Sequence, residues 1–168
     1  DATLAKLRLV GNRTGVAVWG GTLRATRLAI LDNTALGLGA FYGAAEVTVS
    51  DSVIRNNGEF AINADEARVH VTRSVLAGSQ YAFLCFSSVC DVTRSVVADN
   101  DIGFWGQASR GTHANNTYAR NGTAFRSGLA DSPDAVYDDE VRDNRFVGND
   151  IAVNILGIAS SAYRRNTF

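Results

Sequence analysis

The chain has 168 residues, 46% hydrophobic and 20% charged, with a formal net charge of −1, which suits one domain with a sizeable core. The near balance of 16 basic and 17 acidic residues excludes a nucleic-acid-binding protein that depends on bulk charge. No apolar run approaches the roughly 18 residues of a transmembrane helix, so we also expect no membrane span.

A six-residue pattern, VSDSVI in the copy at 49–54, recurs along the whole chain. The copies are 4–9, 25–30, 49–54, 71–76, 92–97, 113–118, 141–146 and 163–168, with spacings of 21, 24, 22, 21, 21, 28 and 22 residues. Five residues after its Ser or Asn comes a second recurring position, which is Asn in six of seven copies: Asn12, Asn33, Asn57, Ser79, Asn100, Asn121 and Asn149. A triplet with a small central residue follows, at 14–16, 36–38, 60–62, 81–83, 102–104, 123–125 and 151–153.

Each copy holds short runs in which apolar and polar residues alternate with period 2, and no segment keeps a period of 3.6. This pattern predicts two or three short strands per repeat, joined by turns. We expect the recurring Asn to take the left-handed backbone conformation in each turn and to hydrogen-bond from copy to copy. One copy cannot bury its apolar side alone, whereas stacked copies can, at about 4.8 Å per step.

The motifs Asn-x-x-[Gly/Ala]-φ and φ-x-φ-x-x-[Ser/Asn]-x-φ, where φ is apolar, resemble the short repeats of the right-handed parallel β-helix in the pectate-lyase-like superfamily. The resemblance covers residues 3–168. It implies an all-β, single-stranded parallel β-helix of seven to eight coils of 21–22 residues, in one domain spanning 1–168. It also implies a secreted, periplasmic or cell-surface location. Such repeats occur in polysaccharide lyases, hydrolases and epimerases, and also in adhesins, tailspikes and structural spacers.

The alignment predicts three columns of core residues. The first is Leu4, Ala25, Val49, Val71, Val92, His113, Val141 and Tyr163. The second is Leu9, Ile30, Ile54, Leu76, Val97, Tyr118, Phe146 and Phe168, and the third is Val16, Leu38, Ile62, Phe83, Phe104, Phe125 and Val153. We interpret His113 as a packed, hydrogen-bonded core histidine.

The 28-residue spacing marks an insertion near 129–140 that contains the only proline and five acidic residues. It is either a solvated excursion between coils or a calcium or substrate loop, since clustered carboxylates suit Ca²⁺. Calcium is the one cofactor that the sequence raises, and no other metal site is expected. The chain starts and stops within the repeat without a capping helix. We therefore expect a fragment or module whose open ends meet a neighbouring domain or another copy.

One set of residues suggests catalysis. His70 and Asp91 share an outward column one strand step apart, as a base and its orienting carboxylate would. Arg73 and Arg94 lie three residues further along each coil and could neutralise a sugar carboxylate, in the manner that the resemblance to lyases implies. The alternative interpretation is an exposed cross-strand pair within alternating surface charges, since Asp51 shares the column of the two arginines.

A second set suggests ligand binding. Trp105 alternates with inward Phe104, so it is expected to point outward, beside Asn63, Leu84, Arg126 and Asn154 by register. A sugar-binding strip combines such a stacking ring with planar hydrogen-bond donors. The alternative is a tryptophan covered by a loop or by a partner.

Cys85 and Cys90 align with inward positions. They are either two free, buried cysteines or a disulfide that closes the turn, which would imply an oxidising compartment. We expect a non-catalytic secreted or cell-surface module that acts as a spacer, an adhesin or a glycan-binding surface. The alternatives are a polysaccharide lyase or epimerase, or an assembly subunit that stacks through its open ends.

Overall fold

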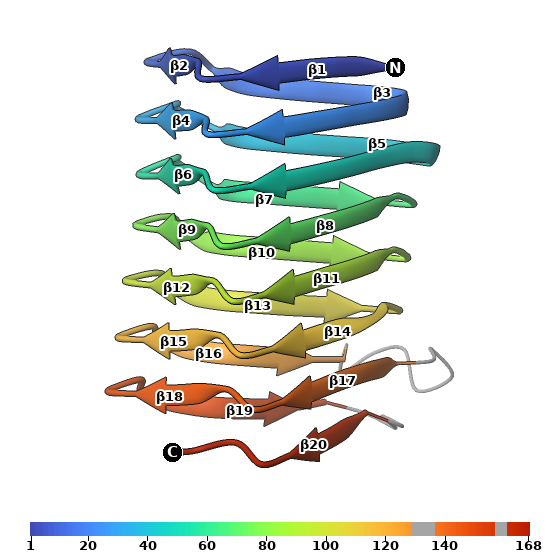
Figure 1. The fold of residues 1–168 in the computed structure, drawn as a ribbon. Helices are drawn as coiled ribbons and strands as arrows, with labels where there is room; N and C mark the ends of the chain where they lie inside the picture. The colour runs from blue at the N-terminus through green and yellow to red at the C-terminus, as the bar shows by residue number, and fades with distance from the viewer. Residues whose placement is uncertain (129–136, 157–160) are drawn as a thin grey trace.

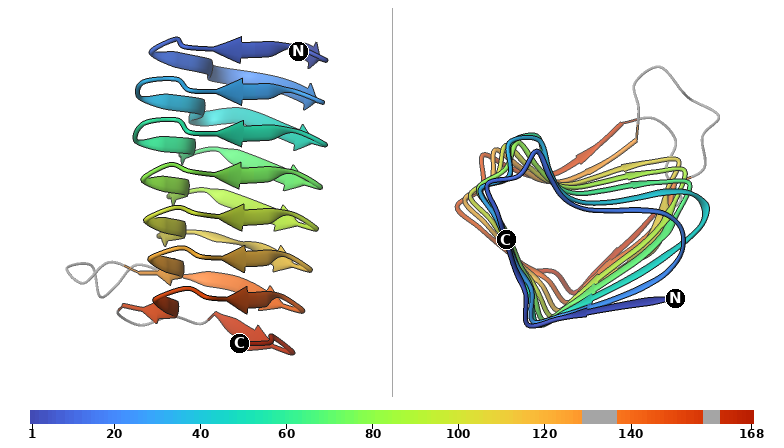
Figure 2. Two further views of the ribbon diagram at one scale, coloured as in Figure 1. Left: turned by 90° about the vertical axis from the view of Figure 1, so that its left-hand side faces the viewer. Right: turned by 90° about the horizontal axis from the view of Figure 1, so that it is seen from above.

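The computed structural model describes residues 1–128, 137–156 and 161–168, which form strands and turns but no helix. Consecutive coils stack along one axis, and the chain turns clockwise as it recedes from a viewer at its N-terminal end (Figures 1 and 2). The fold is therefore the expected right-handed parallel β-helix, with seven strands in its most regular sheet and thus about seven coils. In the described part of the chain, no helix has the length and apolar character needed to cross a membrane.

Three faces run along the solenoid. The first face contains β1 (Ala2–Ala5), the C-terminal parts of β3 (Thr14–Thr26) and β5 (Leu36–Ser50), β8 (Arg68–Thr72), β11 (Val89–Thr93), β14 (Arg110–Ala114), β17 (Asp138–Arg142) and β20 (Ala162–Arg164). The second face contains β2 (Arg8–Val10), β4 (Ala29–Leu31), β6 (Val53–Arg55), β9 (Val75–Ala77), β12 (Val96–Ala98), β15 (Thr117–Ala119) and β18 (Arg145–Val147). The third face contains the N-terminal parts of β3 and β5, then β7 (Phe60–Asp65), β10 (Tyr81–Phe86), β13 (Ile102–Gln107), β16 (Thr123–Ser127) and β19 (Ile151–Ile155).

The three predicted core columns point inward, because successive side chains alternate between the two sides of each short strand. Val49, Ile54 and Ile62 are fully buried, and each stacks on its counterparts in the neighbouring coils. Phe168 differs: it stacks on Phe146 with ring centroids 5.2 Å apart, yet it is 74% exposed.

The expectation that the recurring Asn adopts the left-handed conformation is wrong. The residue immediately before it has the positive φ, as in Asp99 (59°) before Asn100 and Arg120 (53°) before Asn121. The same arrangement precedes the Ser or Asn of the first corner, for example Arg73 (46°) before Ser74. The left-handed residue reverses the chain with its side chain outside, and the next residue then points into the corner.

The inward residues of both corners form hydrogen-bonded ladders along the axis. At the corner between the second and third faces, Asn100 accepts the N–H of Ser79 at 3.0 Å and donates to Asn121 Oδ1 at 2.9 Å. At the corner between the first and second faces, Ser95 Oγ accepts the N–H of Ser74 at 3.1 Å. The ladders satisfy buried backbone donors that the strand pairs leave free.

The structure answers two questions that the sequence left open: the state of the two cysteines and the nature of the insertion. Cys85 and Cys90 form a disulfide across the third corner, and both residues are fully buried. The insertion near 129–140 is not one excursion, because its end belongs to strand β17, where Asp138, Asp139 and Glu140 pair in register with β14. Residues 129–136 lie outside the described part of the chain.

Candidate functional site

The outer side of the third face carries a row of aromatic rings. Phe60, Tyr81 and Trp105 lie on successive coils, with ring centroids 5.2 Å and 5.7 Å apart and interplanar angles of 21° and 27°. These separations exceed the strand spacing of about 4.8 Å, so the rings overlap with an offset. All three side chains are only partly buried, so the row presents aromatic surface to solvent.

Trp105 lies where its register predicts. Leu84 precedes it and Arg126 follows it in the ladder, with Asn63 before Leu84 and Asn154 after Arg126. The structure therefore places the predicted ligand-binding residues in one outward column, with Asn63 and Asn154 each two coils away from Trp105.

The immediate contacts of Trp105 limit how it can meet a ligand. Its indole N–H donates to the carbonyl oxygen of Gly128 at 3.0 Å. The Arg126 guanidinium lies 4.4 Å from the ring centroid, and Tyr81 overlaps the ring from the preceding coil. Arg126 and Tyr81 therefore cover part of the Trp105 ring. A ligand would contact the outer edge of this ring together with the neighbouring aromatic rings.

Two polar atoms beside the row are buried and have no hydrogen-bond partner in the described residues: Asn63 Oδ1 and Arg126 Nε. An unsatisfied buried polar atom costs free energy, which a ligand or ordered water that reaches it would recover.

A second aromatic group lies at the N-terminal part of the same face. Trp19 stacks on Phe41 with ring centroids 4.6 Å apart and contacts Tyr42 at 5.4 Å. Tyr42 is 62% exposed and adopts a left-handed conformation (φ 63°) in a turn that is longer than those of later coils. The sequence analysis did not connect Trp19 with these aromatic residues. The register of Trp19 with Phe41 was the signal that could have done so.

The predicted catalytic residues lie on or beside the first face. His70 and Asp91 are paired in register, with His70 Nδ1 3.7 Å from Asp91 Oδ2 and 43% and 33% of their side chains exposed. The other oxygen of Asp91 accepts the backbone N–H of Thr112 at 2.8 Å. The carboxylate is therefore held by the backbone of the next coil, and the imidazole lies beyond hydrogen-bonding distance.

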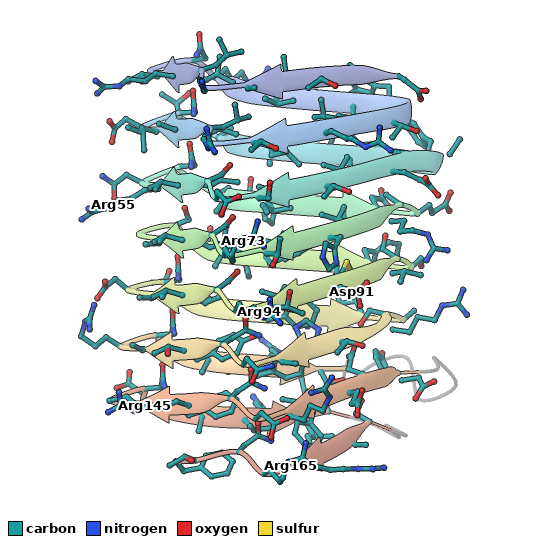
Figure 3. All side chains as sticks on the ribbon, viewed as in Figure 1. Arg55, Arg73, Asp91, Arg94, Arg145 and Arg165 are labelled. Carbon is teal, nitrogen blue, oxygen red and sulfur yellow. A yellow bond between two sulfur atoms is a disulfide. The ribbon has the colours of Figure 1, made fainter. Side chains whose placement is uncertain are left out.

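The two predicted arginines have different surroundings. Arg73 donates two hydrogen bonds to Asp51, at 2.7 and 2.8 Å, and this contact holds the pKa of the Asp51 carboxyl below its ordinary value. Arg94 makes no ion pair with any described residue. Both lie in the same outer row as Arg165, at the corner between the first and second faces (Figure 3). Because Asp51 pairs with Arg73, Arg94 is the one of these two arginines that has no ion pair among the described residues.

Shallow hollows follow the corner between the third and first faces. Three neighbouring hollows share Val89 and Arg110 and extend from Glu46 past Arg68 to Asp138. Their charges are mixed, since Glu46, Arg68, Arg110 and Asp138 stand in one register column. No group of three His, Cys, Asp or Glu side chains that could hold a metal occurs among the residues described.

Comparisons with known proteins identify no relative: no family model, curated protein or solved structure matches the chain. What the fold defines is a parallel β-solenoid of about seven coils with an aromatic outer face.

Proposed function

We propose that this β-solenoid is a non-catalytic module that binds a glycan on the outer side of its third face. The observation that carries the proposal is the concentration of aromatic rings there, in the row Phe60, Tyr81 and Trp105 and in the exposed group around Tyr42. Rings of this kind contact the apolar faces of sugar units, while neighbouring amides and guanidinium groups bind hydroxyls. A rigid solenoid holds them at fixed spacing, which limits the entropy lost on binding.

The buried disulfide between Cys85 and Cys90 supports a secreted, periplasmic or cell-surface location, because such bonds persist in oxidising compartments. The ladders and the coil length support kinship with the pectate-lyase-like superfamily, which we propose on these features alone. The enzyme alternative draws less support. Both side chains of its His70–Asp91 pair are partly exposed to solvent, and its Arg73 is already paired with Asp51.

The test is a glycan array followed by calorimetry on the hits, with and without calcium. We expect Tyr42→Ala and Tyr81→Leu to weaken binding at least tenfold, because each removes a ring from the surface. Val96→Ala removes an equally accessible apolar group from the second face, where Val96 is 41% exposed, and is expected to bind like the wild type. Circular dichroism confirms that each variant is folded.

Absence of binding to any glycan, or unchanged binding by both aromatic variants, would refute the proposal. Depolymerisation of an acidic glycan by the wild-type protein, lost in His70→Ala, would instead establish the enzyme alternative on the first face.

A further inference from the structure

One inward column of the first face changes character along the solenoid. It reads Leu23, Val47, Val69 and Cys90 through the preceding coils, then Gly111 and Asp139. Asp139 is 1% exposed and lies beneath Gly111, which has no side chain to fill the interior. A carboxyl group therefore occupies a core position that is apolar in the coils before Gly111.

The contacts of this carboxyl leave one oxygen for His113. Asp139 Oδ2 is 3.4 Å from the hydroxyl of Ser109, and Oδ1 lies 3.8 Å from Nε2 of His113, with both side chains fully buried. Neither Oδ1 nor Nε2 has a hydrogen-bond partner in the described residues. The other ring nitrogen, Nδ1, is 3.4 Å from the Tyr118 hydroxyl, so Nε2 is the nitrogen that remains for Asp139.

Among the described residues, no positively charged group acts on Asp139. The charged groups that act on Asp139 are Asp138 of its own strand and Asp91 of β11, and both are negative. The phenols of Tyr118 and Tyr163 face it from β15 and β20, and burial raises the pKa of each. The remaining neighbours of His113 are the rings of Phe104 and Phe125, at centroid distances of 4.1 and 4.9 Å.

We propose that Asp139 keeps one proton on Oδ1, the carboxyl oxygen that faces Nε2 of His113 at 3.8 Å, and that the resulting uncharged pair holds the sixth and seventh coils together. With the proton, the carboxyl group and the imidazole carry no net charge. Without it, an unpaired carboxylate remains in an apolar interior beside two other negative groups, which is strongly unfavourable. The pair is thus an alkaline-sensitive joint between β14 and β17.

The direction of the pH response follows from burial. Burial raises the pKa of Asp139 from 3.8 to about 7, so its stabilising proton is fully retained below pH about 4 and is lost as the pH rises through 7. Burial lowers the pKa of His113 from 6.5 to about 3, so its contribution is lost only as the pH falls below 6.5. The two responses oppose each other between about pH 4 and 6.5, and the Asp139 loss acts alone above this window.

The direct test is the titration of the Asp139 side-chain carboxyl carbon, followed by NMR in the wild-type protein. We expect a midpoint near pH 7, and a midpoint near 4 would overturn the proposal. The matched control is Asp143, a partly exposed carboxyl that Arg165 holds at a pKa of about 2.

Hydrogen exchange locates the consequence. After correction for the intrinsic pH dependence, raising the pH from 6 to 9 is expected to lower protection about threefold in β14 and β17, because the loss from Asp139 is partly offset by the gain from His113, with no change in β8. Asp139→Asn keeps the shape and places an amide donor near Nε2, so it is expected to abolish this response. An equal response in wild type and Asp139→Asn, or one spread evenly over all coils, would refute the joint.

Discussion

The second to fifth coils and the sixth and seventh coils share one backbone but have different interiors. The central coils are filled with apolar side chains such as Val47, Val69 and Ile62, all buried. The sixth and seventh coils enclose His113 and Asp139 at equivalent depth. Strand pairing and the corner ladders continue unchanged through both regions. The backbone repeat thus depends on its hydrogen bonds, and the interior accepts polar groups where they find partners.

The largest effect is expected when a carboxyl is placed in the interior of the central coils. Val69 occupies the column of Asp139, but its neighbours Val47 and Cys90 provide no hydrogen-bonding group. We expect Val69→Asp to cost more than about 4 kcal/mol of unfolding free energy at pH 8. The cost is smaller at pH 4, where the acid is largely protonated. Chemical denaturation at the two pH values measures both, and a cost below about 1 kcal/mol at pH 8 would show that the central interior is not selective.

The ladder that both regions share has the next largest expected effect. Asn100 donates to Ala98 O at 2.8 Å and Asn121 Oδ1 at 2.9 Å, and accepts from Ser79 N–H. We expect Asn100→Ala to cost about 3 kcal/mol, because it leaves several buried groups unpaired. The control is Ser79→Ala, which removes a single acceptor for the N–H of Asn57 and is expected to cost about 1 kcal/mol. If urea denaturation gave equal losses of unfolding free energy for the two variants, the Asn100 amide would contribute no more than a single hydrogen bond.

The disulfide reinforces the central coils alone. The double variant Cys85→Ala/Cys90→Ala is expected to lose about 2 kcal/mol, because the bond closes a short loop. Wild-type protein unfolded in the presence of a reductant should show the same loss, and the variant should not respond to it. A variant as stable as the oxidised wild type would contradict this expectation.

The surface charges are expected to matter least. Arg120 donates two hydrogen bonds of 2.7 Å to Asp99, yet 65% and 50% of their side chains are exposed. Because solvent and salt screen such a pair, we expect Arg120→Ala to leave the thermal midpoint unchanged within reproducibility. A midpoint shift as large as that of Ser79→Ala, and one that disappears at high salt, would show that the outer row supports the fold.

The sequence predicted the stacking but misplaced the turn residue. Spacing alone located the two corners on either side of the second face to within one residue, and the recurring Asn position was correctly identified as a ladder. It could not tell which of two adjacent residues reverses the chain. The backbone has to turn before the side chain of Asn100 can point inward, so the left-handed conformation falls on Asp99.

The contacts of the candidate surfaces were also predicted only in part. The register of Trp105 with Arg126 followed from the alignment, whereas the overlap with Tyr81 and the hydrogen bond to Gly128 did not. Tyr81 begins the triplet that contains the core residue Phe83, and the alignment offered no reason to place it outside. The inward position of Asp139 was hidden because it falls within the predicted insertion.

By itself the sequence determined the repeat, the coil length and the inward columns. Alternation of apolar and polar residues along a strand is a local property, so it can be seen in the sequence of each copy separately. Only the tertiary structure decided the pairing of Cys85 with Cys90, the aromatic group around Trp19 and the burial of Asp139. These contacts join residues across corners or between coils whose connections differ in length. Register after such a connection is set by the strand pairing of the whole stack, which no single repeat encodes.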